Sequence, residues 1–106
     1  MTLYHATTEE GFVSICESQC IKPRFSDKTV YLAKSPISAI RFVAHRVPIT
    51  EDLYVFEVDI PDSNVFETFD HNPSFFKCRS YGYKGSIGTG MCTGCIKYPG
   101  IKVEYK

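Results

Sequence analysis

The chain has 106 residues, with twelve basic and twelve acidic side chains and 43% hydrophobic residues. This length predicts a single domain over residues 1–106, and the balanced charge argues against the broad basic surface of a duplex nucleic-acid binder. Since no apolar run reaches the roughly 18 residues of a membrane span, we expect a soluble, cytoplasmic protein without a membrane partner.

The first two elements are predicted from residue type and spacing. TLYHA (2–6) is typical of a short strand. Thr7 followed by Glu10 has the spacing of a capping box, which predicts a helix over residues 8–20. The helical period gives this helix one apolar side, made of Phe12, Ile15, Cys16 and Gln19.

A strand and a second helix are expected next. TVYLA (29–33) is β-branched and aromatic, and it is predicted to be a strand. In SPISAIRFVAHR (35–46), Ser35 suits the N-cap and Pro36 suits the first helical position, so a helix is predicted over 36–46. Its apolar stripe is expected to consist of Ile37, Ile40 and Val43 with Ala44.

The second half of the chain is predicted to be mainly strands. LYVFEVDI (53–60) alternates, with Tyr54, Phe56, Val58 and Ile60 on one face and Leu53, Val55, Glu57 and Asp59 on the other. VFETF (65–69) and IKVEYK (101–106) are expected to be strands, and 70–95 to hold one or two strands with a mobile loop. This order favours an α+β fold with a mostly antiparallel sheet.

Three segments occur in a fixed order within residues 3–44: YHATT (4–8), TVYLA (29–33) and SPISAIRFV (35–43). The first is similar to a His-Gly-Ser/Thr motif on a first strand, the second to a strand that carries a tyrosine. The third is similar to a helix in which a Ser-Ala pair precedes an aromatic. Together they resemble the ADP-ribosyltransferase fold, the NAD-binding family of the diphtheria-toxin-like enzymes and the poly(ADP-ribose) polymerases. The resemblance implies two small, mostly antiparallel sheets around a cleft, with two short helices.

The resemblance also implies which residues bind NAD. His5 would bond to a ribose hydroxyl, and the backbone at Ala6, in a motif that continues into Thr7, would hold the nicotinamide amide. Tyr31 would stack on the nicotinamide ring, because aromatic faces attract delocalised cations. Ser38 would contact the same amide through its hydroxyl. Ala6 stands where the family usually has glycine.

Two functions remain open within this resemblance. The family carries a catalytic glutamate on a late strand, but its expected place near GTGMC (88–92) holds no carboxylate. Glu57, Glu67 and Glu104 are the available substitutes, of which Glu57 is the candidate catalytic residue. The chain is therefore either an NAD-dependent enzyme that transfers ADP-ribose to an unknown macromolecular acceptor, or an inactive module that binds NAD, ADP-ribose or a related nucleotide.

The glycine-rich stretch SYGYKGSIGTG (80–90) is expected to be a flexible loop. Within the resemblance it takes the place of the loop that covers or presents the acceptor, so Tyr81, Tyr83 and Lys84 are candidate substrate contacts. The acceptor itself is not predicted. Recognition of a single strand by aromatic side chains requires less excess positive charge than binding to a duplex.

The cysteines allow a second interpretation. Their number, five, is odd and favours a reducing compartment over a disulfide scaffold. If helix and loop meet, one zinc ion could be bound by Cys16, Cys20, Cys92 and Cys95. Free cysteines are also common in cores, and the apolar side of the first helix already accounts for Cys16. We therefore expect NAD rather than zinc.

Overall fold

The computed structural model describes residues 1–23, 28–44, 47–48, 50–68 and 80–100. Within these ranges the strands are β1 (Thr2–Thr8), β2 (Cys20–Ile21), β3 (Thr29–Ala33), β4 (Leu53–Asp59), β5 (Val65–Thr68), β6 (Ser80–Lys84), β7 (Ile87–Gly88) and β8 (Cys92–Tyr98). The helices are α1 (Glu9–Ser18) and α2 (Pro36–Ala44), with short 3₁₀ turns at Asp62–Asn64 and Thr89–Met91. Neither α1 nor α2, the α-helices of the described part of the chain, is long and apolar enough to cross a membrane.

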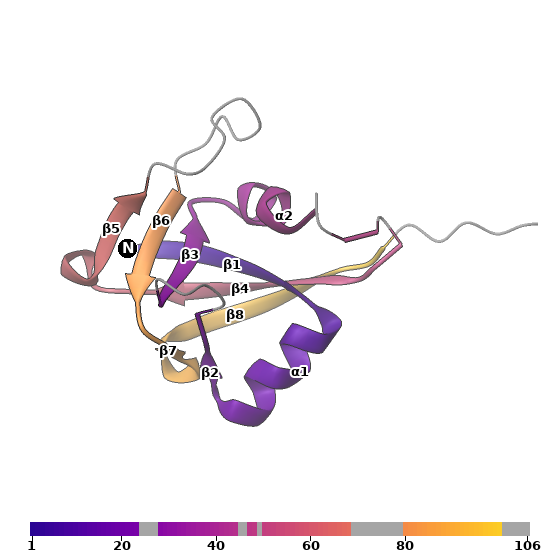
Figure 1. Cartoon of the computed structure of the whole chain (residues 1–106), viewed down its shortest axis with the longest axis horizontal. Coiled ribbons are helices and arrows are strands. Elements are labelled where there is room, and N and C mark those ends of the chain that lie inside the picture. The colour runs from indigo at the N-terminus through magenta and orange to yellow at the C-terminus, as the bar shows by residue number, and fades with distance from the viewer. Residues whose placement is uncertain (24–27, 45–46, 49, 69–79, 101–106) are drawn as a thin grey trace, which may run out of the picture.

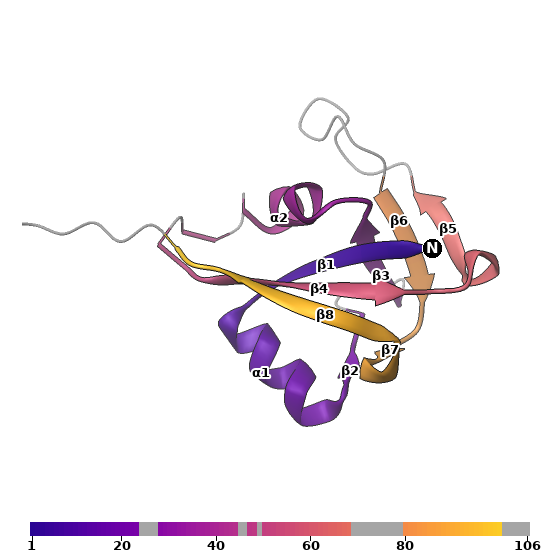
Figure 2. The same cartoon turned by 180° about the vertical axis from the view of Figure 1, so that it is seen from behind.

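Six strands form one antiparallel sheet in the order β5-β6-β3-β1-β4-β8, and β2 pairs with β7 in a second, smaller sheet. Figures 1 and 2 show β5, β6 and β3 running steeply, whereas β1, β4 and β8 run along the molecule. The large sheet therefore bends between β3 and β1. The prediction of an α+β fold with mostly antiparallel sheets is confirmed, and the two sheets are unequal in size.

Helices cover both faces of the large sheet (Figure 1). The face under α1, here called the α1 face, carries one buried cluster, made of Leu3, Ile15, Ile21, Val30, Leu32, Phe56, Val58, Ile60, Tyr81 and Ile87. The opposite α2 face carries a second cluster of Ala6, Ala33, Ala39, Val43, Leu53 and Val55. The predicted alternation of β4 is confirmed, since its two sets of side chains enter the two clusters.

Helix α1 begins one residue later than predicted. The side chain of Thr8, not Thr7, accepts a hydrogen bond from the backbone N–H of Gly11 at 3.3 Å. The helix ends at Gln19, whose backbone is left-handed with φ 58° and whose N–H bonds to Ile15. Ile15 is buried, but Cys16 is exposed. The prediction that Cys16 belongs to the buried side was wrong, because the face of α1 that packs on the sheet is narrower than the predicted apolar side and includes Ile15 but not Cys16.

Helix α2 begins as predicted. The Ser35 hydroxyl accepts a 3.1 Å hydrogen bond from the backbone N–H of Ser38, which is the bond of an N-cap. The predicted stripe was wrong at Ile37, whose exposed fraction is 63%. Val43 is buried as predicted, but Ala44 is exposed. Ala39 is buried in place of Ile37, because its small side chain packs in one cluster with the alanines of β1 and β3. The predicted end of the helix, at residues 45–46, lies outside the described residues.

The chain from residue 80 onward differs most from expectation. One or two strands were predicted within residues 70–95, and β6 and β7 agree with this. The flexible loop expected over residues 80–90 was wrong, because these residues form β6, a turn at Gly85 with φ 90°, and β7. Tyr81 and Ile87 are buried, which explains why this stretch is held as strands. The strand expected over 65–69 is confirmed as β5, and the one expected over 101–106 lies outside the described residues.

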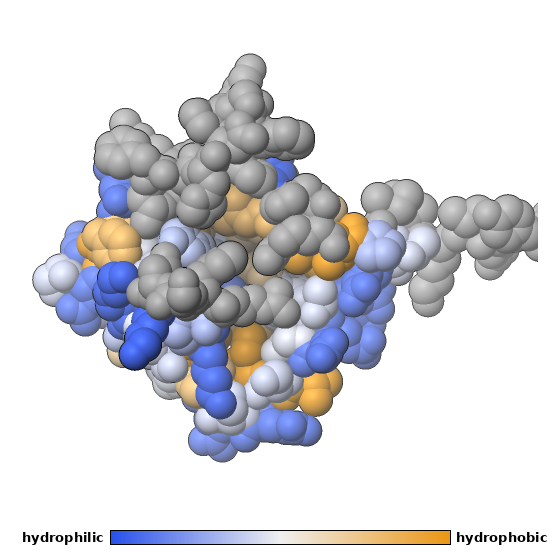
Figure 3. Space-filling view, viewed as in Figure 1, coloured by the Kyte–Doolittle hydropathy of each residue, from blue (hydrophilic) through white to orange (hydrophobic). Residues whose placement is uncertain are grey.

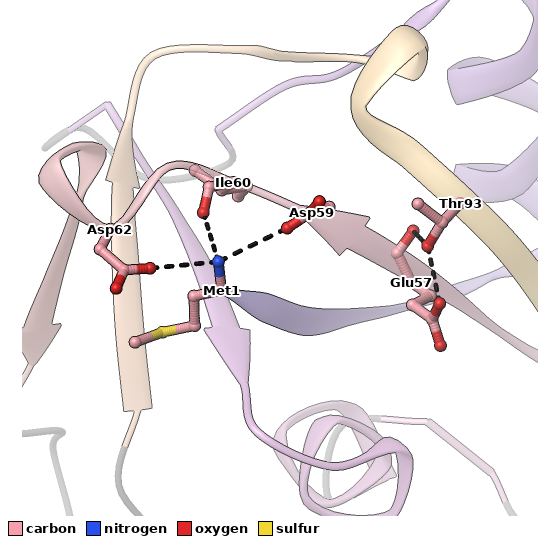
Figure 4. Close-up of polar contacts among 6 residues, drawn as sticks. All are labelled: Met1, Glu57, Asp59, Ile60, Asp62 and Thr93. Carbon is pink, nitrogen blue, oxygen red and sulfur yellow. Dashed lines mark hydrogen bonds and ion pairs between the residues drawn. The ribbon is translucent and has the colours of Figure 1, made fainter.

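The start of β1 is fixed to the end of β4. The amine of Met1 donates a 2.8 Å hydrogen bond to the carbonyl of Ile60 and forms ion pairs with Asp59 and Asp62 (Figure 4). These contacts lie beside the β1–β4 ladder, which pairs every residue of β1 with β4 from Thr2 opposite Asp59 onward. The position of β1 is therefore set from the β4 side of the sheet.

Candidate functional site

The β1–β3 junction is where the predicted NAD motifs meet. Within the described residues, the two strands are paired only at Tyr4 and Ala33. An extended ladder would next join His5 to Leu32 and Ala6 to Tyr31, but the strands part there. In an antiparallel strand, successive residues direct their backbone groups to opposite neighbours. The place beyond Tyr4 and Ala33, where no further β1–β3 pair follows in the described residues, is here called the β1–β3 opening.

The side chain of His5 bridges this opening. Its Nδ1 atom lies 3.3 Å from the backbone oxygen of Tyr31. A carbonyl oxygen can only accept a hydrogen bond, so the bond requires the proton on Nδ1. In the neutral ring, the lone pair is then on Nε2, the kind of acceptor that a ribose hydroxyl needs.

The predicted binding residues come from both faces of the sheet. His5 lies opposite Phe56 on β4, so it belongs to the α1 face, together with Thr7. Ala6 and Tyr31 alternate to the α2 face, because Ala6 and Ala33 are both in that cluster. His5 and the Tyr31 ring can therefore contact one ligand only where the β1–β3 ladder ends.

Thr7 and Ser38 have structural contacts of their own. Thr7 has an exposed fraction of 7%, and its hydroxyl packs so tightly on Gly11 that a Cβ at residue 11 would collide with it. Ser38 is half-buried in the first turn of α2, where its Oγ accepts a 2.9 Å hydrogen bond from the Ser35 hydroxyl. Thr7 supports α1, whereas Ser38 lies on the helix that covers the face of Tyr31.

The carboxylate of Glu57 joins three strands. Its Oε2 accepts a hydrogen bond from the Tyr4 hydroxyl at 3.2 Å. Its Oε1 accepts one from the Thr93 hydroxyl at 2.7 Å, and Figure 4 shows this second contact. Burial and the negative charge of Glu57 raise the pKa of the Tyr4 phenol. Glu57 lies on the α2 face of β4, and β1 separates it from β3 and Tyr31.

Comparisons of the whole chain with protein-family models, curated proteins and solved structures gave no match.

The three residues predicted to contact the acceptor, Tyr81, Tyr83 and Lys84, lie on strand β6 and not on a loop. Tyr81 has an exposed fraction of 8% and belongs to the α1-face cluster, against which Tyr83 also packs. Lys84 is exposed and lies opposite Thr29, on the α2 face. The expected loop is instead strand β6, which turns Tyr81 and Tyr83 toward the core, and a substrate contact by these residues stays a prediction.

The four cysteines of the zinc interpretation are spread over three elements. Cys16 is on α1, Cys20 lies in β2 beyond the helix end, and both Cys92 and Cys95 are on β8, not in a loop. In the described part of the chain, no three His, Cys, Asp or Glu side chains are grouped to hold a metal ion. Burial raises the pKa of Cys92, and burial with the charges of Cys16 and Cys92 raises that of Cys95.

The sequence reasoning missed Phe66 and Gly82. They lie directly opposite each other on β5 and β6, and the Phe66 ring covers the glycine. A glycine inside a strand pattern, here between Tyr81 and Tyr83, often marks the close approach of another group. That signal was present, but its partner is defined only by the β5–β6 register.

Proposed function

We propose that the chain binds NAD, or another nucleotide that contains ADP-ribose, where β1 and β3 part. The observation that carries the proposal is the His5 contact with the Tyr31 carbonyl, at the point where the β1–β3 ladder stops. It brings the first two segments of the ADP-ribosyltransferase resemblance to one opening in the sheet. Their order along the chain alone did not require this.

Each proposed contact has a physical reason. The Nε2 atom of His5 accepts a hydrogen bond from a ribose hydroxyl, and backbone groups near Ala6 form hydrogen bonds with the nicotinamide amide. The half-buried Tyr31 offers a ring face to the nicotinamide cation. Ser38 contributes a hydroxyl from the helix above the same face. Ala6 is buried, so its methyl group restricts how closely the amide approaches.

The proposal is for binding without transfer of ADP-ribose. Transfer of ADP-ribose develops positive charge on the ribose, and a carboxylate that stabilises this charge has to lie against the ribose. Both oxygens of Glu57 accept hydrogen bonds from Tyr4 and Thr93, and β1 lies between Glu57 and Tyr31. The transferase remains the second candidate, because the same His5 and Tyr31 positions would serve it.

Proton NMR of NAD with the purified chain tests the proposal. We expect the NAD signals to broaden and no free nicotinamide to accumulate over hours. His5→Ala and Tyr31→Ala should each weaken binding at least about fivefold, which corresponds to about 1 kcal/mol. Tyr31→Phe keeps the ring and should bind nearly as well, and Val13→Ala, on exposed α1 surface, is the matched control.

Each other outcome has a definite meaning. Growth of a nicotinamide signal would show that the chain cleaves NAD, and it would then be a glycohydrolase or transferase and not a binding module. Sharp, unchanged signals with NAD and with ADP-ribose would overturn the proposal. Wild-type affinity in folded His5→Ala and Tyr31→Ala variants would show that the ligand binds elsewhere.

A further inference from the structure

An aromatic surface lies on the α2 face toward the β5 edge of the large sheet. Tyr31, Gly82 and Phe66 stand directly opposite one another on the adjacent strands β3, β6 and β5. A Cβ at residue 82 would lie 2.5 Å from Cζ of Phe66 and 2.9 Å from Cγ2 of Thr29. The Phe66 ring thus occupies the space beside the β6 backbone that a side chain at residue 82 would take.

The ring of Phe66 is both supported and open. One side rests on Gly82, yet 40% of the residue is exposed. The described part of the α2-face cluster contains no side chain from β5 or β6. Figure 3 shows an apolar area over β5 that is bordered by hydrophilic residues, and Phe66 is the exposed large hydrophobic residue of β5. A planar ring could stack there once the Lys84 side chain, whose Nζ lies over the Phe66 ring, turns aside toward a phosphate.

Two lysines lie at one end of this surface. The Nζ of Lys84 is 5.8 Å from the centroid of the Phe66 ring. Lys28 precedes Thr29, the residue opposite Lys84, and its carbonyl accepts a 2.8 Å hydrogen bond from Gly85. Both lysines are exposed, and Lys28 has a left-handed φ of 56° that non-glycine residues seldom adopt. Positive charge is therefore fixed beside the aromatic surface.

We propose that this surface binds single-stranded nucleic acid, with a base stacked on Phe66 and the adjoining phosphates near Lys28 and Lys84. Aromatic faces next to basic side chains are the usual means of binding single strands with little sequence preference. In the described part of the chain Phe66 is 40% exposed and not enclosed, which favours a strand over a free mononucleotide, because small ligands are normally held in concave sites. A duplex is also disfavoured, since its bases are already stacked and the chain has zero net charge.

Fluorescence anisotropy of a labelled oligothymidylate tests the proposal on the full chain. Phe66→Leu keeps an apolar cover over Gly82 but loses the aromatic face, and it should weaken binding about fivefold or more. Phe66→Tyr should bind as the parent does. Val13→Ala, another exposed apolar position, should have no effect. Circular dichroism of each variant verifies that it is folded.

The salt dependence tests the lysines separately. Two phosphate contacts predict a slope of log K against log salt of about −1.4 for a single strand. Lys28→Gln and Lys84→Gln should each reduce that slope by about 0.7. Lys97→Gln, an exposed lysine on β8 at the opposite edge of the large sheet, should leave the slope unchanged.

Three results would overturn the proposal. One is unchanged affinity in folded Phe66→Leu, and another is equal affinity for duplex and single strand. The third is competition by thymidine monophosphate as strong as that of the oligonucleotide, which would indicate a mononucleotide site. The proposal does not rest on NAD binding: Phe66→Leu should bind NAD normally, and His5→Ala should bind the oligonucleotide normally, so the two proposals fail separately.

Discussion

Tyr4 and Glu57 face each other across the β1–β4 ladder, and the tyrosine hydroxyl donates a 3.2 Å hydrogen bond to the glutamate. Thr93 on β8 donates to the other oxygen of the same carboxylate. One half-buried charge thus satisfies donors from both neighbouring strands. This arrangement explains why an acidic residue is tolerated in β4 between buried Phe56 and Val58.

The Tyr4 phenol should therefore titrate above its ordinary pKa of 10.0, because burial and then the Glu57 charge both disfavour the phenolate. A folded-state pKa above the unfolded one stabilises the fold below pH 10, and this contribution is lost as the pH rises through the raised value. Phenolate absorbance, assigned by difference from Tyr4→Phe, measures the pKa. Glu57→Gln should lower it toward 10.0, whereas Thr93→Val keeps the charge and should leave it raised. An unchanged pKa in Glu57→Gln would show that the carboxylate does not act on Tyr4.

Removing the cap of α1 should destabilise the fold. Thr8→Ala leaves the N–H of Gly11 without its side-chain acceptor, and we expect the free energy of unfolding to fall by about 1 kcal/mol. Thr8→Ser keeps the hydroxyl and should retain most of the stability. Chemical denaturation measures both variants. A Thr8→Ala variant as stable as the parent would contradict the assignment of Thr8 as the cap.

The sequence was sufficient to predict the elements with clear local signals. Ser35 and Pro36 marked the start of α2 correctly, and the two-residue period of β4 assigned both of its faces. Helical periodicity failed at Ile37 because the contact with the sheet is made through alanines. Size complementarity between Ala39 and the alanines of β1 and β3 is a property of the packed pair of elements, and the helix sequence does not reveal it.

The candidate site was only partly predictable for a related reason. His5 and Tyr31 were chosen together, but their faces depend on the β1–β3 register and on where that ladder ends. Neither segment contains that information. The same holds for Phe66, which is placed over Gly82 by the pairing of two strands that are separated by residues 69–79 in the chain. Long-range register, unlike a cap or a period, has no local signal.

The two apolar residues Ile15 and Val13 of α1 should differ sharply in their effect on stability. Ile15 is 6% exposed within the α1-face cluster, so Ile15→Ala should lower the free energy of unfolding by about 3 kcal/mol through lost burial and a residual cavity. Val13 is 47% exposed, and Val13→Ala should change it by no more than about 0.5 kcal/mol. Denaturant unfolding compares the two. Equal losses would mean that α1 packs on the sheet through a different face.

Alanine at Gly82 should be costly, whereas alanine at Gly94 should not. At residue 82 the new Cβ would enter the space of the Phe66 ring and Thr29, and such overpacking costs about 1–3 kcal/mol. At Gly94 on the exposed strand β8 a Cβ would meet nothing within 4 Å, so Gly94→Ala should be neutral or stabilising by up to about 1 kcal/mol. Thermal or denaturant unfolding measures both.

The same substitution connects stability with the aromatic surface. If the Phe66 ring is what obstructs the methyl group, Gly82→Ala should cost less in a Phe66→Ala background, and the difference is the coupling between the two residues. Part of the cost should remain, because Thr29 Cγ2 would still lie 2.9 Å from the new Cβ. Gly82→Ala alone should also tilt the ring away from β6 and weaken oligothymidylate binding. Additive effects of the two substitutions would show that the ring does not rest on Gly82.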